Sequence, residues 1–189
     1  MLALIAGTGD LPPAILAQCD EPILCCAIAG FAPSVPVDLT FRIEHLGSFL
    51  AELRARGVTD VCMAGAIRRP QIEPSTIDEA TMPLVPQIQQ AIASGDDGAL
   101  RAIIAIFEDH GLTIRAAHEI APKLLPPSGL LTDAPLPATI DADVAAGDAT
   151  LVEMGRNDSG QACVIRDGVA VLQEAQDGTD AMLRSAIGE

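Results

Sequence analysis

The chain has 189 residues, 49% of them hydrophobic, and a formal net charge of −15 from 11 basic and 26 acidic residues. This length suits one domain, or one domain with a smaller second one. The charge argues against a nucleic-acid partner, because neutralising a polyanion needs clustered Lys and Arg. Apolar runs are too short for a membrane span. The cysteines form no Cys-x-x-Cys pair and are typical of buried thiols in a reducing cytoplasm.

The N-terminal stretch predicts a buried strand that ends in a glycine turn. Residues 2–6 are apolar and are followed by Gly7, Thr8 and Gly9, a pattern typical of a parallel strand. Asp10 can cap the helix that follows. A strand, a glycine turn and a helix start together present backbone N–H groups to a phosphate. A tight turn without a ligand is the alternative.

This turn differs from a dinucleotide-binding fingerprint. The position of the third glycine holds Pro12, and the second predicted strand, residues 23–29, is followed by Gly30 instead of an acid for a ribose hydroxyl. No Gly-Lys-Ser/Thr follows, so the turn is not a Walker A loop either. A Rossmann-type oxidoreductase is therefore the least favoured function.

Further along, apolar strands alternate with helices. Strands are predicted at residues 23–29, 58–64 and 112–115, and helices at 45–56, 85–93 and 99–110, with a proline-rich loop at 30–40. This alternation indicates an α/β fold with a Rossmann-like parallel sheet. Ligands of such sheets bind at the carboxyl ends of the strands.

Several polar side chains follow these predicted strands. Arg68 and Arg69 come shortly after Gly65 and suit a phosphate or pyrophosphate, although a solvated surface pair is the alternative. His118 follows the strand at 112–115 and could touch a phosphate, transfer a proton or be structural. Residues 96 and 97 are both Asp. They could cap the next helix or serve a hard cation.

A proline-rich stretch, residues 122–137, divides the chain. We therefore expect an N-terminal domain at residues 1–125, a linker at 126–138 and the start of a smaller α/β C-terminal domain at 139–189. The C-terminal part predicts a helix at 139–154 and a hairpin of strands 161–165 and 169–174. Glu174, Asp177, Thr179 and Asp180 follow it. They could hold Mg²⁺ with several waters retained, or form an acidic loop with a helix cap.

Five stretches with these features occur in one order along the chain. They are residues 5–12 (IAGTGDLP), 64–70 (AGAIRRP), 95–97 (GDD), 117–119 (AHE) and 174–183 (EAQDGTDAML). This ordered set resembles the LpxI-type UDP-2,3-diacylglucosamine pyrophosphatases of lipid A biosynthesis, and the resemblance covers essentially the whole chain. It implies an active site between a Rossmann-like domain and a C-terminal domain. It also implies a divalent cation, Mg²⁺ or another such as Mn²⁺, and water attack on the α-phosphorus, with UMP and 2,3-diacylglucosamine 1-phosphate as products.

The motifs and this resemblance together give an expected site. Catalytic roles are expected for Glu174, Asp177 and Asp180, with Asp177 and Asp180 as metal contacts. The amides of Thr8 and Gly9 would hold the polar head of the substrate. The substrate contacts expected are Gly7, Thr8, Gly9, Leu11, Gly65, Arg68, Arg69, Asp96, Asp97, His118 and Thr179.

The resemblance also implies a cytoplasmic homodimer that transiently contacts the inner membrane surface to reach its lipid-linked nucleotide sugar. Similar proteins continue for several dozen residues and carry there an Asp important for catalysis. We expect that Asp to have no counterpart among these 189 residues, so the C-terminal domain is expected to be incomplete. A truncated, non-catalytic fragment that binds nucleotide or lipid is therefore the alternative function.

Overall fold

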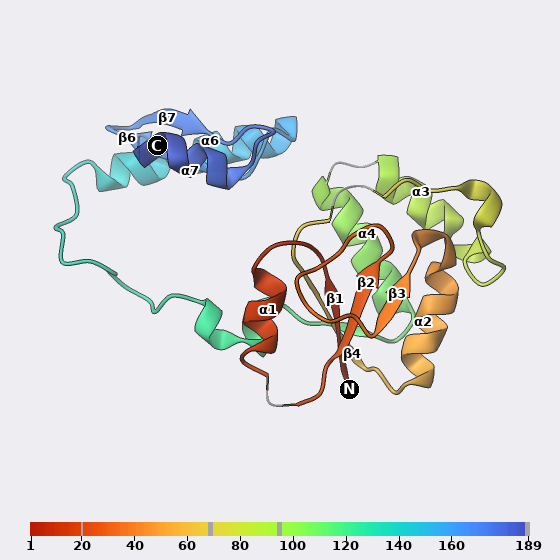
Figure 1. Cartoon of the computed structure of the whole chain (residues 1–189). Coiled ribbons are helices and arrows are strands. Elements are labelled where there is room, and N and C mark those ends of the chain that lie inside the picture. Colours follow the sequence, from red (N-terminus) through yellow and green to blue (C-terminus); the bar gives the residue numbers. More distant parts are fainter. Residues whose placement is uncertain (20, 68–69, 94–95, 188–189) are drawn as a thin grey trace. The chain divides into compact units, whose positions relative to one another are not determined.

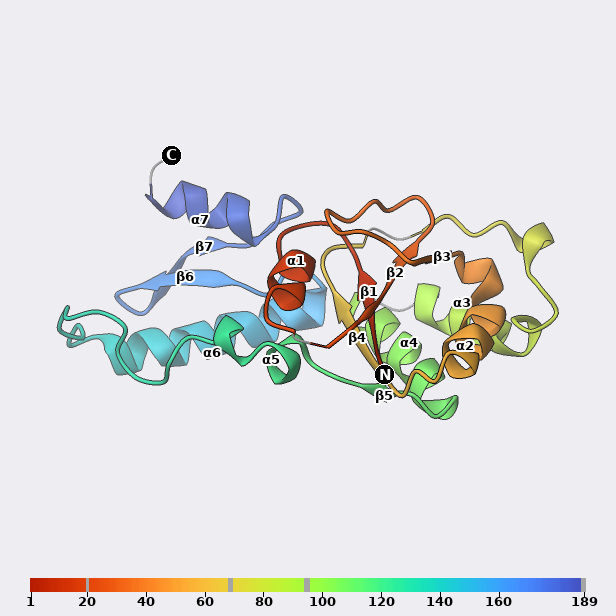
Figure 2. The same cartoon turned by 60° about the horizontal axis from the view of Figure 1, so that its bottom comes forward.

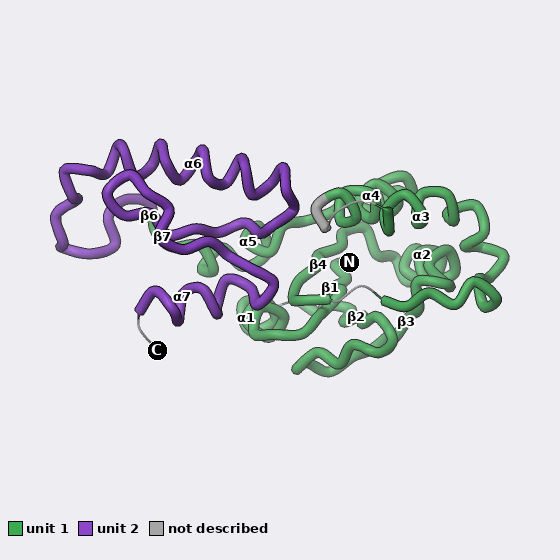
Figure 3. The backbone as a smooth tube through the Cα atoms, turned by 90° about the horizontal axis from the view of Figure 1, so that it is seen from above, with its two compact units in different colours: residues 1–127 green, residues 128–189 purple. Residues whose placement is uncertain are grey.

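The structure is a computed structural model that describes residues 1–19, 21–67, 70–93 and 96–187 (Figure 1). The chain divides into two compact units, Met1–Pro127 and Ser128–Glu189, coloured separately in Figure 3. Residues 125–139, where the chain passes from one unit to the other, form no helix or strand. Among the described residues, no helix has both the length and the apolar character needed to cross a membrane.

Unit 1 is built on a five-stranded parallel sheet with the order β3-β2-β1-β4-β5. Its strands are β1 (Leu2–Ala6), β2 (Leu24–Ile28), β3 (Leu39–Phe41), β4 (Asp60–Ala64) and β5 (Thr113–Ile114). The chain places β2 and β3 on one side of β1 and then crosses to place β4 on the other side. The strand order therefore reverses between β1 and β4, which is where open α/β sheets bind ligands.

Helices cover both faces of this sheet (Figures 1 and 2). The helices of unit 1 are α1 (Leu11–Leu16), α2 (Leu46–Ala55), α3 (Val85–Ala93), α4 (Asp96–Asp109) and α5 (Ala117–Ile120), with short 3-10 helices at Ile43–His45, Pro74–Thr76, Met82–Leu84 and Pro122–Leu124. One hydrophobic core lies between the sheet and helices α2, α3 and α4. A smaller core lies between the sheet and helices α1 and α5.

Strand alternation explains how one short apolar run serves both cores. In β1, Ala3 and Ile5 belong to the larger core, and Leu4 and Ala6 belong to the smaller one. Successive side chains of a strand point to opposite faces, so a strand covered on both sides must be apolar throughout. The predicted α/β fold with a parallel sheet is confirmed.

Unit 2 consists of helix α6 (Ile140–Asn157), strands β6 (Cys163–Arg166) and β7 (Val169–Gln173), and helix α7 (Thr179–Ile187). The two strands pair antiparallel, and the predicted hairpin is confirmed. Asp167 and Gly168 of its turn both have positive φ, at 51° and 76°, as a two-residue hairpin turn requires. Asp143 of α6 holds this turn, because its carboxylate accepts the Gly168 N–H at 2.6 Å and the Thr139 hydroxyl at 2.9 Å.

The structure differs from the sequence prediction at strand β3 and at the start of helix α4. Strand β3 lies within and just beyond a stretch predicted as loop. Asp38 aligns β3 with β2, since its N–H donates to the Cys25 carbonyl at 2.8 Å and its carboxylate accepts the Cys25 N–H at 2.8 Å. Helix α4 begins at Asp96, three residues before the predicted start. Asp96 and Asp97 are therefore its first two residues.

Candidate functional site

The carboxyl ends of β1 and β4 are joined by backbone hydrogen bonds. Gly7 N–H donates to the Ala64 carbonyl at 2.7 Å, and Thr8 and Ala66 exchange two N–H···O bonds of 2.9 Å. The Thr8 hydroxyl also donates to the Ala66 carbonyl, at 3.1 Å. The residues that follow β1 and β4, where the strand order reverses, are therefore joined by a short backbone bridge.

This bridge depends on two glycines that face each other. A Cβ on Gly7 would lie 2.6 Å from the Ala66 carbonyl oxygen, and a Cβ on Gly65 would lie 2.7 Å from the Thr8 carbonyl oxygen. Real Cβ atoms do not come so close to backbone atoms. The sequence predicted substrate contacts for both glycines. Their positions give each of them a packing role that does not require a ligand.

Beyond the bridge, three consecutive amides are open. Thr8 N–H already donates to the Ala66 carbonyl, so this amide is not open to the polar head of the substrate that the sequence predicts for it. The amides of Gly9, Asp10 and Leu11 have no hydrogen-bond partner among the described residues, and all three residues are exposed. Asp10 stands at the N-cap position of α1, but its side chain makes no capping bond. Open amides at a glycine turn suit an anion.

The other substrate contacts expected in unit 1 are two arginines, two aspartates and a histidine. Arg68 and Arg69 lie outside the described residues, as do the side chains of Asp96 and Asp97. His118 is exposed on α5, and no hydrogen bond joins it to the glycine turn within the part of the chain that the structure describes. The structure thus brings together Gly7, Thr8, Gly9, Leu11 and Gly65.

In unit 2, Glu174 makes contacts that fix the local backbone. One of its carboxylate oxygens accepts the Gln161 N–H at 2.9 Å, and the other accepts the Thr179 hydroxyl at 3.0 Å. Its own N–H donates to the Ala162 carbonyl. Glu174 therefore ties the loop before β6 to the first residue of α7, and Thr179 is occupied by the same contact.

Asp177 and Asp180 differ from Glu174 because both are exposed and neither has a partner among the described residues. Asp180 lies in the first turn of α7, where a negative charge is favoured by the helix dipole. No group of three or more His, Cys, Asp or Glu side chains within the described ranges is placed to hold a metal ion. Glu174, Asp177 and Asp180 are therefore not gathered as three metal ligands in these ranges, and the two metal contacts expected from the sequence, Asp177 and Asp180, stay a prediction.

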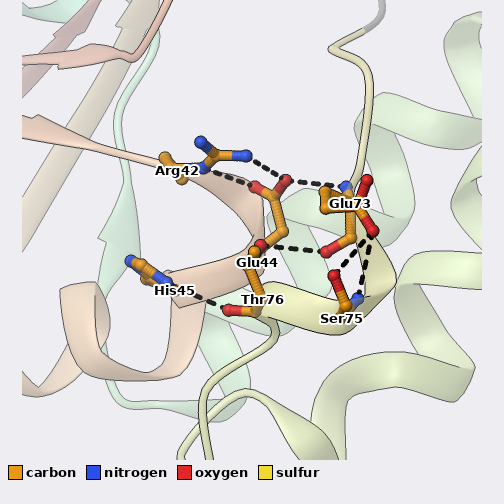
Figure 4. A network of polar contacts seen from close by, with 6 residues as sticks. All are labelled: Arg42, Glu44, His45, Glu73, Ser75 and Thr76. Atoms are coloured by element: carbon orange, nitrogen blue, oxygen red, sulfur yellow. Dashed lines mark hydrogen bonds and ion pairs between the residues drawn. The ribbon is translucent and has the colours of Figure 1, made fainter.

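A second polar cluster, which the sequence analysis did not find, centres on a buried carboxylate in unit 1 (Figure 4). Glu44 is 3% exposed, and both of its carboxylate oxygens accept hydrogen bonds from Arg42. Oε1 accepts from Arg42 Nη2 at 2.7 Å, and Oε2 accepts from Arg42 Nε at 3.3 Å. It also accepts the Glu73 N–H at 2.8 Å. The hydrogen bond from Arg42 is the main reason why the pKa of Glu44 is lowered to about 2. This cluster fastens the segment that follows Pro70 to the end of β3.

The cluster borders a cavity of about 400 Å³ at the carboxyl ends of β2 and β3. Its lining includes Gly30, Phe31, Arg42, Glu44 and Gln71. No sequence motif predicted the polar cluster around Glu44. Glu44 and Glu73 are 29 residues apart, and neither lies in a recognisable motif.

Comparison with protein families decides the identity of both units. Residues 1–124 match the LpxI N-terminal domain, and residues 127–188 match the LpxI C-terminal domain. The chain belongs to the LpxI family. A curated relative, the UDP-2,3-diacylglucosamine pyrophosphatase LpxI of Caulobacter vibrioides, is 33% identical over 190 residues, which cover 97% of this chain and 68% of the relative.

The family assignment confirms the resemblance that the ordered motifs indicated. It concerns both units of the chain. The roles of their individual residues remain predictions.

Proposed function

We propose that this LpxI-family chain hydrolyses UDP-2,3-diacylglucosamine to UMP and 2,3-diacylglucosamine 1-phosphate, a step of lipid A biosynthesis. The observation that carries the proposal is the 33% identity, over 97% of the chain, to a relative named for its pyrophosphatase activity on this compound. The matches to both LpxI domains support it.

The first part of the proposed mechanism is binding of the pyrophosphate in unit 1. The open amides of Gly9, Asp10 and Leu11 would donate hydrogen bonds to phosphate oxygens. Arg68 and Arg69 would neutralise phosphate charge, which matters in a chain whose net charge is −15. Gly7 and Gly65 would act indirectly, because their close packing holds the turn that carries these amides.

The second part is attack by water on the α-phosphorus. The new P–O bond forms as the bond from the α-phosphorus to the bridging oxygen breaks, and 2,3-diacylglucosamine 1-phosphate leaves with that oxygen. Asp180 and Asp177 would orient the water as hydrogen-bond acceptors, since both carboxylates are exposed and unpartnered among the described residues. Glu174 would position them by holding the start of α7.

The proposed reaction requires a divalent cation, Mg²⁺ or another such as Mn²⁺. The carboxylates of the acidic loop do not by themselves fit a three-ligand site in the described residues, so no step is assigned to the ion. Activity measured with Mg²⁺, with Mn²⁺ and after EDTA treatment tests the requirement.

The test of the reaction is incubation of the purified chain with UDP-2,3-diacylglucosamine and Mg²⁺ in water enriched in ¹⁸O. We expect UMP to be released and to carry one ¹⁸O, because water adds to the α-phosphorus. Label in the sugar phosphate instead would place the attack on the β-phosphorus. A folded chain that releases no UMP would reject the hydrolase proposal.

A non-catalytic role in binding nucleotide or lipid is the second candidate. It is favoured by the contacts of Glu174, because its two carboxylate oxygens already accept the Gln161 N–H and the Thr179 hydroxyl. Calorimetric binding of UMP by a chain that fails the hydrolysis assay would support this candidate.

We also propose that the chain transiently contacts a membrane surface and that it forms a homodimer. Leu125, Leu130, Leu131 and Leu136 are each more than half exposed in the segment between the two units, and their apolar side chains could meet lipid or acyl chains. Flotation with anionic and neutral vesicles tests the first point, and sedimentation equilibrium tests the second.

A further inference from the structure

The cavity beside β2 and β3 lies at the edge of the sheet where a Rossmann-like fold binds nucleotides. Its walls come from three places, namely the loop after β2, the residues after β3, and the segment at Pro70 and Gln71. About 400 Å³ of space is within the range of small-ligand sites. The loop after β2 is also joined to the glycine turn, because the Ser34 hydroxyl donates to the Gly9 carbonyl at 3.4 Å.

One wall carries a fixed guanidinium group. Two nitrogens of Arg42 are held by Glu44, and the third, Nη1, is turned away from Glu44 in Figure 4 and has no partner among the described residues. Glu44 cancels the positive charge of Arg42 within the lining. The pair therefore suits a neutral group that accepts a hydrogen bond better than it suits a phosphate.

Another wall carries an aromatic ring. The chain has four phenylalanines, and three of them, Phe41, Phe49 and Phe107, are buried in the larger core and pack on one another. Phe31 packs against the edge of the same core, but it is only half-buried and also lines the cavity. The part of its ring that lines the cavity is thus available to a planar ligand, and aromatic rings stack favourably on nucleobases.

We propose that this cavity binds the nucleoside part of the nucleotide sugar. The uracil ring stacks on Phe31, and Arg42 Nη1 donates to a uracil carbonyl or a ribose hydroxyl. The link from Ser34 to Gly9 then puts the nucleoside next to the open amides proposed to hold the pyrophosphate. This inference deepens the proposed function and rests on it for the identity of the base.

The test is calorimetric titration of the full chain with UMP, a ligand that is not turned over. Phe31→Ala and Arg42→Lys are compared with two controls on the same unit, Val37→Ala and Arg56→Ala. Val37 is exposed on the same loop, and Arg56 forms an exposed ion pair with Glu52. Arg42→Lys keeps a cation beside the buried Glu44, so that folding is preserved while the planar donor group is lost.

We expect each cavity variant to weaken UMP binding by about 10-fold or more, and both controls to bind as the unchanged chain does. Methyl NMR signals of Ile28 and Ile43, which line the cavity, should shift more with UMP than with ribose 5-phosphate, which lacks the base. Unchanged binding in Phe31→Ala and Arg42→Lys, or equal competition by ribose 5-phosphate, would overturn the inference.

The hydrolysis assay separates this inference from the proposed function. Binding of UMP that depends on Phe31, in a chain that hydrolyses nothing, supports the nucleoside site and rejects the enzyme proposal. Hydrolysis in a chain whose UMP affinity is indifferent to Phe31 and Arg42 supports the enzyme and rejects the site.

Discussion

Gly7 and Gly65 lie so close across β1 and β4 that a Cβ added to either would come within 2.8 Å of the other's carbonyl carbon. Two turns from distant parts of the chain can meet here only because both residues lack a side chain. The contact holds the Thr8–Ala66 bridge and, through it, the open amides that begin at Gly9.

A comparison of Gly65→Ala with Gly9→Ala tests this packing. Both glycines have a positive φ, 93° and 99°, but an added Cβ at Gly9 meets nothing within 4 Å. We expect Gly9→Ala to lower the free energy of unfolding by about 1 kcal/mol through backbone strain alone. Gly65→Ala should lower it by about 3 kcal/mol, because a backbone collision is added. Urea denaturation measures both, and equal losses would contradict the proposed contact.

The buried Glu44 should make stability depend on pH in the acid range. The hydrogen bond from Arg42 lowers the pKa of Glu44 to about 2, so its contribution is fully present above about pH 4.5 and is lost as the pH falls toward 2. The shift corresponds to at most about 3 kcal/mol, reduced because Arg42 is 47% exposed. Glu44→Gln should therefore be destabilised at pH 7 and approach the unchanged chain at pH 2.5. Glu52→Gln, in an exposed ion pair, is the control and should show almost no difference at either pH.

Asp143 should stabilise unit 2 more than its neighbour in the same helical turn does. Its carboxylate holds Gly168 N–H and the Thr139 hydroxyl, whereas Asp141 is exposed. We expect Asp143→Ala to cost about 2 kcal/mol and Asp141→Ala to cost about 0.5 kcal/mol through the helix dipole. Hydrogen exchange at the Gly168 amide gives a direct measure. If this amide exchanges equally slowly in both variants, the assigned bond is wrong.

The cysteines should differ in reactivity. Burial raises the pKa of Cys26 to about 12 and that of Cys62 to about 11, so neither thiol carries appreciable thiolate at pH 8. We expect iodoacetamide to label them only after unfolding, while the half-buried Cys163 is labelled in the folded chain. Mass spectrometry of peptides from native and urea-treated samples measures the order. Rapid native labelling of Cys26 would show that the larger core opens.

Asp180→Asn and Glu174→Gln should separate catalysis from positioning. Asp180→Asn should reduce turnover by about 10-fold or more, because the attacking water loses a charged hydrogen-bond acceptor. The melting temperature should change little, because Asp180 is exposed and has no partner among the described residues. Glu174→Gln should lower the melting temperature, because it weakens the contacts to Gln161 and Thr179. Unchanged turnover in Asp180→Asn would make this residue a helix-capping group only.

Local sequence patterns were sufficient wherever burial or turn geometry repeats along the chain. The apolar run at residues 2–6 predicted β1, because a strand covered on both faces must be apolar throughout. Residues 166–168 predicted the hairpin, because Asp-Gly adopts the positive φ angles that its turn requires. The ordered motifs were sufficient for the family, which both domain matches confirm.

The partners of the polar groups were decided only by the tertiary structure. Nothing near Thr8 in the sequence shows that its amide is used by Ala66, nor that Glu44 is buried against Arg42 and the backbone of Glu73. A run of apolar residues follows from the period of one element. Whether a particular amide or carboxylate is open to a ligand depends on which distant segment reaches it when the sheet closes, and buried polar groups take whichever partner that closure supplies.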